Sequence, residues 1–257
     1  MNDETVICER RDGVATVTLN RPESRNGITG RMMRQLHATL VELAGDDATR
    51  VVVLTGAGSS FCVGADLKHY SSGEPDEGAP AETFEIPVLL HEMPAVTIAA
   101  VNGAAAGAGL GWAAACDLRV AARSAVFNTA FLDVAVAGDM GGPWTLSRLL
   151  GGAKARELYL LPGRFPADEA LRIGLVSAVH DDAEFPAAIA TLAARLAGAA
   201  PLALRAMKQN FVSAEQVGFA EFVRVETERH QRVTASEDCI EAFKAFVEKR
   251  APRFKGR

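Results

Sequence analysis

Two segments with small residues at their centre stand where a strand is expected to pass into a helix, and each could present backbone N–H groups to a ligand. The first covers residues 61–67 and follows the apolar run 51–55; the second covers 102–111 and follows the run 95–101. Small residues after a parallel strand let a ligand approach the backbone, and a helix that begins there points free N–H groups at it. One N–H from each segment could form an oxyanion hole for a carbonyl that gains negative charge.

Each segment also has a purely structural explanation. Residues 61–67 have the composition of an ordinary tight turn. Residues 102–111 hold four glycines. Each Gly costs about 1 kcal/mol relative to Ala in a helix, so their presence must serve a purpose. Close packing of a helix on a sheet would be such a purpose. The second segment does not follow the GxGxxG pattern, so a dinucleotide site is poorly supported.

Asp139 is the carboxylate best suited to proton transfer. It stands among glycines, in the stretch Ala137-Gly138-Asp139-Met140-Gly141-Gly142, with few charged residues nearby. A carboxylate that points into an apolar pocket has a raised pKa, closer to the range useful for moving protons. The alternative is a turn or N-cap residue before a helix predicted over 143–150.

Composition and charge narrow the class of protein. The 257 residues are 49% apolar and 23% charged, with 46 Ala and 23 Gly, which is typical of a globular chain and excludes a disordered or collagen-like one. The net charge of −5 argues against nucleic acid as the main partner. No run reaches the ~18 apolar residues of a membrane span, and the start MNDETVICERRDG lacks an apolar signal core. We therefore expect a cytoplasmic protein without a membrane partner.

The cysteines are too dispersed to form an obvious site. They show no CxxC pair and no His at ligand spacing, so we expect buried, reduced thiols and neither a disulfide nor a metal site. They are Cys8, Cys62, Cys116 and Cys239.

The elements that must position these residues can be predicted from hydrophobic periodicity. Strands are expected over 14–19, 51–55 and 95–101, and a helix begins after Thr29, a plausible N-cap, and runs to Leu43. Strands that alternate with helices indicate crossover connections and a largely parallel sheet. Residues 71–80 are expected to form a mobile surface loop beside the active-site mouth. After about residue 182 only helical patterns follow, over 183–199, 201–211, 215–232 and 236–249.

The chain resembles the crotonase (enoyl-CoA hydratase/isomerase) superfamily over nearly its whole length. Several motifs occur in a fixed order, and residues 70–92 are the part that the resemblance covers least. The motifs are LNRPESRNGIT (19–29), VVVLTGAGSSFCVGADL (51–67), AVTIAAVNGAAAGAGLGWAAACDLRVAARSAVF (95–127), DMGGPWTLSRLLGGAKARELYL (139–160), ADEALRIGLVSAV (167–179) and AFVEKRAPRFKG (245–256).

The resemblance implies an α/β fold in two parts. A crotonase-like ββα spiral core over residues 1–195 would bind acyl-CoA and carry out catalysis. A helical C-terminal region over 196–257 would drive assembly into a homotrimer, or a hexamer made of two trimers. No separate cofactor is implied, because coenzyme A is part of the substrate.

The resemblance also implies roles for individual residues. The N–H groups of Ala65 and Ala108 would hold the thioester oxygen, with Ala108 standing where the family more commonly has Gly. Phe246 and Lys249 would reach the coenzyme A of a neighbouring subunit, although helix packing and surface charge would explain these two equally simply. The segment expected to contact coenzyme A within the same subunit comprises Val63, Ala65, Asp66, Leu67 and Lys68.

The pair of glutamates that serves hydration in this family is missing. Gly111 and Phe131 occupy the two positions, and neither can titrate. The resemblance is strongest to the isomerase branch that acts on 3-enoyl-CoA and phenylacetate-derived CoA thioesters, whose catalytic aspartate matches Asp139. We therefore expect a double bond to be shifted by proton transfer through Asp139.

Three other interpretations stay open. The chain could be a hydratase that uses a non-standard carboxylate, supplied by Glu82, Glu85 or Glu92. It could be a non-catalytic acyl-CoA binding protein. Asp139 could also act as a nucleophile, as in the dehalogenase branch of the superfamily.

The remaining candidates have simpler explanations. We expect Asp133 to face solvent, Cys62 to be a small buried residue, and His69 and His91 to lie at surface or helix-end positions. Phe131 and Trp144 are expected in the wall of the acyl pocket.

Overall fold

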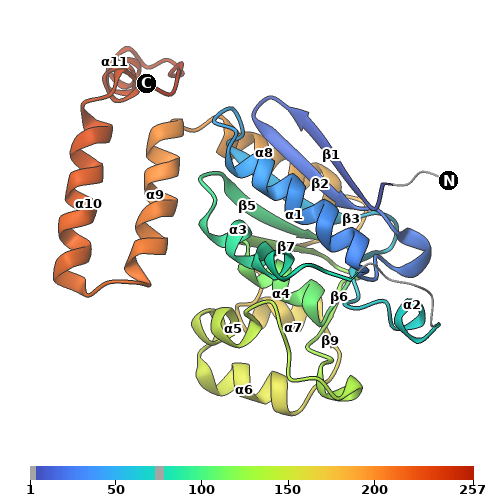
Figure 1. The fold of residues 1–257 in the computed structure, drawn as a ribbon. Helices are drawn as coiled ribbons and strands as arrows, with labels where there is room; N and C mark the ends of the chain where they lie inside the picture. The colour runs from blue at the N-terminus through green and yellow to red at the C-terminus, as the bar shows by residue number, and fades with distance from the viewer. Residues whose placement is uncertain (1–3, 73–77) are drawn as a thin grey trace.

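The computed structural model describes residues 4–72 and 78–257, and two β-sheets form its centre (Figure 1). The larger sheet has six strands in the order β1-β2-β3-β5-β7-β10. β1 and β2 form an antiparallel hairpin, and every other pairing is parallel. The prediction of a largely parallel sheet is thus confirmed. The strands are β1 (Val6–Arg11), β2 (Val14–Leu19), β3 (Val51–Gly56), β5 (Val96–Val101), β7 (Leu118–Ala122) and β10 (Ala178–His180).

A smaller sheet of short strands lies beside the first. Its order is β4-β6-β8-β9, and β9 is antiparallel to its neighbour. The chain crosses from the larger sheet to the smaller one three times, in the pairs β3–β4, β5–β6 and β7–β8, which gives the spiral of ββα units that the resemblance implies. These strands are β4 (Ser60–Cys62), β6 (Ala104–Ala106), β8 (Val126–Asn128) and β9 (Phe165–Pro166).

Helices pack around the sheets of this core. α1 begins after the predicted N-cap, because the Thr29 hydroxyl accepts a hydrogen bond from Met32 N–H. Part of the loop predicted over 71–80 falls on residues 73–77, which lie outside the described residues; residue 71 is the last of α2. The helices are α1 (Gly30–Ala44), α2 (Leu67–Ser71), α3 (Ile86–Glu92), α4 (Ala108–Ala115), α5 (Gly142–Leu150), α6 (Gly152–Leu160) and α7 (Ala167–Arg172).

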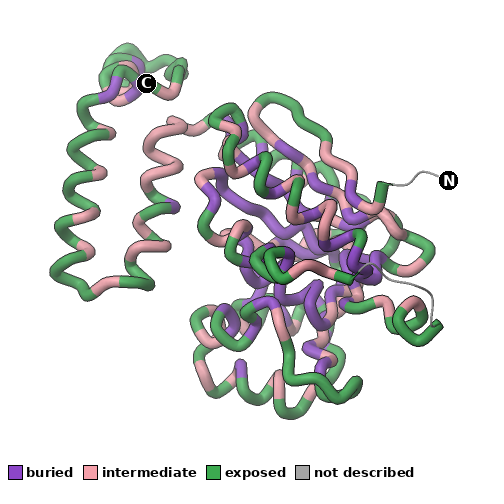
Figure 2. The backbone as a smooth tube through the Cα atoms, in the orientation of Figure 1, coloured by how far each residue is buried: buried purple, intermediate pink, exposed green. Residues whose placement is uncertain are grey.

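The C-terminal part is helical, as predicted. α8 covers one face of the larger sheet, where Phe185, Ile189 and Ala193 are buried against β3, β5 and β7. Figure 1 shows α9 and α10 side by side, standing away from the sheets, and Figure 2 shows that they are mostly exposed or half-buried. The boundary proposed after residue 195 falls inside α8 and stays an interpretation. These helices are α8 (Phe185–Ala197), α9 (Pro201–Ala214), α10 (Phe219–Thr234) and α11 (Glu237–Glu248).

The cysteines follow the prediction in part. All four are free thiols, and burial raises the pKa of both Cys62 and Cys116 to about 12. Cys8 and Cys239 are only half-buried, so the expectation of burial was wrong for these two. Cys8 lies on β1 at the edge of the sheet, where one side of the strand remains open to solvent.

A buried ion pair ties α9 to the core. Lys208 is 5% exposed, and its ammonium lies 2.8 Å from a carboxylate oxygen of Asp117. The ammonium also donates to the backbone carbonyls of Leu90 and Ala95. The Asp117 carboxylate in turn accepts from Thr97 N–H at 2.7 Å. Lys208 thus joins three parts of the core: Leu90 near the end of α3, Ala95 just before β5, and Asp117 after α4.

Within the described ranges, no single helix is long and apolar enough to cross a bilayer. Only α8 and α9 taken together meet the criterion, and they are bent by 102° relative to each other.

Candidate active site

A groove of about 870 Å³ runs along the turn between β4 and α2. All five residues predicted to contact coenzyme A within one subunit line it: Val63, Ala65, Asp66, Leu67 and Lys68. Three further cationic side chains border the groove, Arg21, Arg25 and Arg164. The groove therefore combines backbone, apolar and cationic surface, which suits a phosphate-bearing ligand.

The turn that lines the groove is held by the preceding loop. Ile28 pairs with Ala65 as an isolated parallel bridge, in which Ile28 N–H donates to Gly64 and Asp66 N–H donates to Ile28. The guanidinium of Arg21 lies 2.9 Å from the Asp66 carboxylate. Burial opposes ionisation of Asp66, but hydrogen bonds from His69 N–H and Arg21 outweigh it and lower the pKa. Asp66 is therefore a charged residue that caps α2 and fixes the loop.

The two segments with small residues at their centre meet at a pair of glycines. Gly64 and Gly107 both have positive φ, of 84° and 52°. A Cβ added at Gly64 would lie 3.6 Å from both the nitrogen of Ala108 and the Cα of Gly107. Because both positions demand glycine, the two backbones can approach to this distance.

Two backbone N–H groups at this junction are available to a ligand. The bridge to Ile28 uses the atoms of Gly64 and Asp66, which leaves Ala65 N–H pointing elsewhere. Ala108 is the first residue of α4, whose first N–H groups have no partner within the helix. Neither N–H donates to another group in the part of the chain that the structure describes. The left-handed conformation is carried by Gly107, so Ala at position 108 needs no unusual backbone.

The glycines of the second segment serve both of the explanations considered from the sequence. A Cβ at Gly109 would lie 2.4 Å from the carbonyl oxygen of Cys62, so that glycine allows α4 to pack on the smaller sheet. Gly107 instead shapes the turn that exposes Ala108 N–H. Packing and presentation of the amide are thus divided between two residues.

Asp139 does not line the groove. Its neighbours in sequence connect it to both segments. The ring of Phe131 lies 3.4 Å from a Cβ added at Gly138 and 3.8 Å from one added at Gly107. On the other side Met140 contacts Gly111, one turn of α4 beyond Ala108.

The environment of the Asp139 carboxylate favours its neutral form. Oδ1 is buried and has no hydrogen-bond partner within residues 4–72 and 78–257. Desolvation by burial raises the pKa of this carboxyl above its ordinary value of 3.8. The N-cap of α5 is Gly141, and the backbone carbonyl of Asp139 only accepts a weak bond of 3.4 Å from Gly142 N–H. The alternative of an N-capping side chain is therefore wrong.

Tyr159 on α6 is a neighbour of Asp139 that the sequence did not reveal. Its ring stacks on Phe131, with centroids 5.8 Å apart and planes inclined by 14°. Its hydroxyl lies 1.8 Å from the place of a Cβ at Gly142, so only glycine fits there. Burial, with a contribution from the charge of Asp139, raises the pKa of the phenol to about 12. No motif marks this contact, because Tyr159 stands in an ordinary amphipathic helix.

Most of the other candidates lie at the surface and apart from the site, but Asp133 and His69 also line the groove. Glu82, Glu85, Glu92 and Asp133 are exposed, the last as predicted. His91 bonds to Glu215 at 2.7 Å and packs edge-on against Trp144, which is 42% exposed. His69 is half-buried in α2.

Phe246 and Lys249 are not brought to the groove within one chain. They lie at the end of α11, which Figure 1 shows at the opposite end of the molecule from α2. The described residues contain no cluster of His, Cys, Asp and Glu that could hold a metal ion.

The raised pKa of Asp139 makes a prediction about stability. A carboxyl whose pKa is higher in the folded state destabilises the fold when ionised, and this penalty is absent below the unfolded value of 3.8. We expect Asp139→Asn to have a higher thermal midpoint than the wild type at neutral pH. The difference should shrink as pH falls through the folded pKa and stay constant below the unfolded one. Thermal melts from pH 3 to 8 measure this, with the exposed Asp133→Asn as control. A pH-independent difference would contradict the assigned environment.

Known proteins resemble this chain in both sequence and fold. A sequence model of the family described as "Enoyl-CoA hydratase/isomerase" matches residues 9–257. A protein named 1,2-epoxyphenylacetyl-CoA isomerase, from Escherichia coli (strain K12), is 36% identical over 260 residues and covers 99% of each chain. One named (E)-benzylidenesuccinyl-CoA hydratase, from Thauera aromatica, is 37% identical over 255 residues, covering 98% of this chain and 99% of its own. The crystal structure of an enoyl-CoA hydratase from Bacillus anthracis superposes with a TM-score of 0.91 at 31% identity, covering 99% of this chain and all of its own.

Proposed function

The chain belongs to the enoyl-CoA hydratase/isomerase family, and from this premise we propose that it shifts a double bond in an acyl-CoA thioester by proton transfer through Asp139. The observation that carries the proposal is the Asp139 carboxyl, whose buried Oδ1 lacks a partner and whose pKa is raised. Its sequence neighbours Met140 and Gly138 contact Gly111 and Phe131, respectively, whereas Glu82, Glu85 and Glu92 are exposed. A raised pKa suits a group that must first accept a proton and then return it.

Binding of the thioester is assigned to the groove. Its coenzyme A would lie along Val63, Ala65, Asp66, Leu67 and Lys68, with Arg25 and Arg164 available to its phosphates. The thioester oxygen would accept from Ala65 N–H and Ala108 N–H. These donors are backbone groups held by Gly64 and Gly107, so they are already oriented before charge develops on the oxygen.

The reaction then needs a single acid–base group. With a 3-enoyl thioester, the Asp139 carboxylate removes a proton from C2, and the electron pair moves onto the thioester oxygen as a dienolate. The two N–H groups stabilise this charge. The neutral Asp139 then returns a proton to C4, which leaves the double bond between C2 and C3. Substrate and product have the same atoms, and Asp139 ends as a carboxylate.

A wild-type experiment tests this function. Incubation with a 3-enoyl-CoA should give the 2-enoyl-CoA, and in D₂O the product should carry deuterium only to the extent that Asp139 exchanges its proton with solvent, which mass spectrometry measures. A hydratase would instead add one water to a 2-enoyl-CoA. A non-catalytic binding protein would retain the thioester in a calorimetric titration without exchange or product. Either of the last two results would overturn the proposal.

Hydration is the second candidate because relatives that cover the whole chain carry hydratase names as well as an isomerase name. Under that alternative a carboxylate other than the usual pair would activate water. Glu82, Glu85 and Glu92 are exposed in this chain, which favours the isomerase.

Assembly into a homotrimer or hexamer is also proposed. Three phenylalanines of the C-terminal helices are largely exposed in the single chain: Phe211 (76%), Phe219 (82%) and Phe246 (85%). Large apolar side chains at such exposure are typical of surfaces that a partner covers. In the assembly, Phe246 and Lys249 would approach the coenzyme A held by a neighbouring subunit.

A further inference from the structure

The segment that carries Asp139 has an unusual backbone. Gly138, Met140 and Gly141 all have positive φ, of 102°, 53° and 67°. Glycine adopts such angles freely, but a side chain as long as that of Met does so rarely, and only where its surroundings hold it. Met140 is therefore a position that the rest of the structure must support.

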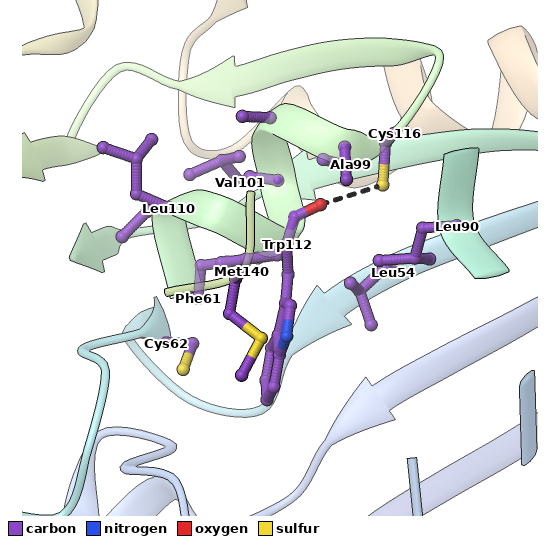
Figure 3. Packing of buried hydrophobic residues seen from close by; sticks show 14 of the residues in the cluster. Leu54, Phe61, Cys62, Leu90, Ala99, Val101, Leu110, Trp112, Cys116 and Met140 are labelled. Carbon is purple, nitrogen blue, oxygen red and sulfur yellow. Dashed lines mark hydrogen bonds between the residues drawn. The ribbon is translucent and has the colours of Figure 1, made fainter. Parts of the chain in front are cut away.

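The support comes from α4. Met140 is 5% exposed. A Cβ added at Gly111 would lie 2.7 Å from Met140 Cβ and 3.3 Å from its carbonyl oxygen, so the contact depends on glycine at that position. Figure 3 shows the Met140 thioether alongside the indole of Trp112, which is fully buried in the same cluster. Contacts between sulfur and an aromatic ring are favourable.

We propose that Met140, seated on Gly111 and Trp112, is the positioning residue that holds Asp139 in place and keeps water from the space above Gly111. This inference rests on the proposed function, because it explains how the acid–base group is fixed. It gives Gly111 a role of its own. Because Gly111 has no side chain, Met140 Cβ and the Met140 carbonyl group occupy the space beside it. In this proposal that space is filled by Met140 and not by a water molecule.

Two single variants should disturb the contact between Gly111 and Met140, one from each side. Gly111→Ala pushes Met140 away, and Met140→Gly removes the anchor while keeping the positive φ favourable. In each, kcat for isomerisation should fall about tenfold or more, while KM for the thioester changes less than twofold. Entry of water should also lower the pKa of Asp139, which moves the acid limb of the kcat profile to lower pH. A merely structural role for Met140 would not move that limb.

Combination and conservative replacement make the test specific. In Gly111→Ala/Met140→Gly the added Cβ no longer meets a side chain, so the double variant should be no worse than Met140→Gly alone. Met140→Leu keeps Cβ and most of the volume and should recover most of the activity. Wild-type kcat in Met140→Gly, or effects that multiply in the double variant, would overturn the proposal.

The same set of four proteins can be compared by thermal stability, without measuring turnover. Thermal midpoints of the wild type, both single variants and the double variant should be non-additive if the two residues share one contact. A wild type without isomerase activity would refute the proposed function, and additive midpoints would refute the contact. The two failures are therefore distinguishable.

Discussion

Asp139→Asn is expected to reduce kcat for double-bond shift by about 10³-fold, within the range of general acid–base catalysis. This corresponds to about 4 kcal/mol in the activation free energy. The amide has nearly the shape of the carboxylate but cannot take a proton from carbon. The effect should therefore fall on kcat, and the dissociation constant of a saturated acyl-CoA should change little, because the groove residues do not include Asp139.

The measurement pairs steady-state isomerisation with calorimetric binding of the saturated thioester. Asp47→Asn serves as the control, since the Asp47 side chain is 93% exposed and does not line the groove. Its kcat should remain within about twofold of the wild type, as for most surface substitutions. If Asp139→Asn kept wild-type turnover, another group would have to move the proton. If it lost binding as well, the loss of turnover could not be assigned to proton transfer.

Lys208→Met is expected to lower the free energy of unfolding by about 3 kcal/mol, because it leaves the Asp117 carboxylate, whose side chain is 25% exposed, without its counterion. The variant also removes the donor to the carbonyls of Leu90 and Ala95. Asp117 would keep its hydrogen bond from Thr97 N–H, but its charge would be uncompensated. Urea denaturation, followed by far-UV circular dichroism and tryptophan fluorescence, measures the change through the midpoint and slope.

A second ion pair, which also involves a residue of α9, provides the control. Arg205 lies 2.8 Å from Asp47, whose side chain is 93% exposed, and Arg205→Met should cost no more than about 1 kcal/mol, as exposed pairs do. Asp117→Asn in the Lys208→Met background should recover part of the loss, since it removes the unpaired charge. A Lys208→Met protein as stable as the Arg205→Met protein would show that the buried pair does not anchor α9.

The parts of the fold that could be predicted are those with a repeating pattern. The continuous apolar runs at 51–55 and 95–101 identified β3 and β5, and Thr29 marked the start of α1. The strands β4, β6 and β8 could not be found in this way. Each is three residues long, which is too short for an alternating pattern to stand out.

In the candidate site, too, the residues that could be predicted are those marked by a local sequence pattern. Residues 61–67 and 102–111 could be recognised because glycine-rich turns after strands have few explanations, and Asp139 because glycines surround it. Met140 and Tyr159 could not, since their contacts join positions far apart in sequence and each residue type is ordinary in a core. Lys208 also looks like a solvated helix residue until the structure places it beside Asp117.

The meeting of Gly64 and Gly107 has a consequence for how this site can diverge. The groups offered to the thioester oxygen belong to the main chain, so replacing the side chain of Ala65 or Ala108 leaves the donors in place. Mutation can instead vary the segment from Phe131 to Gly142, where the acid and the aromatic rings lie. Evolution can therefore change the reaction at the acyl chain in this fold while the two backbone N–H donors to the thioester oxygen are retained.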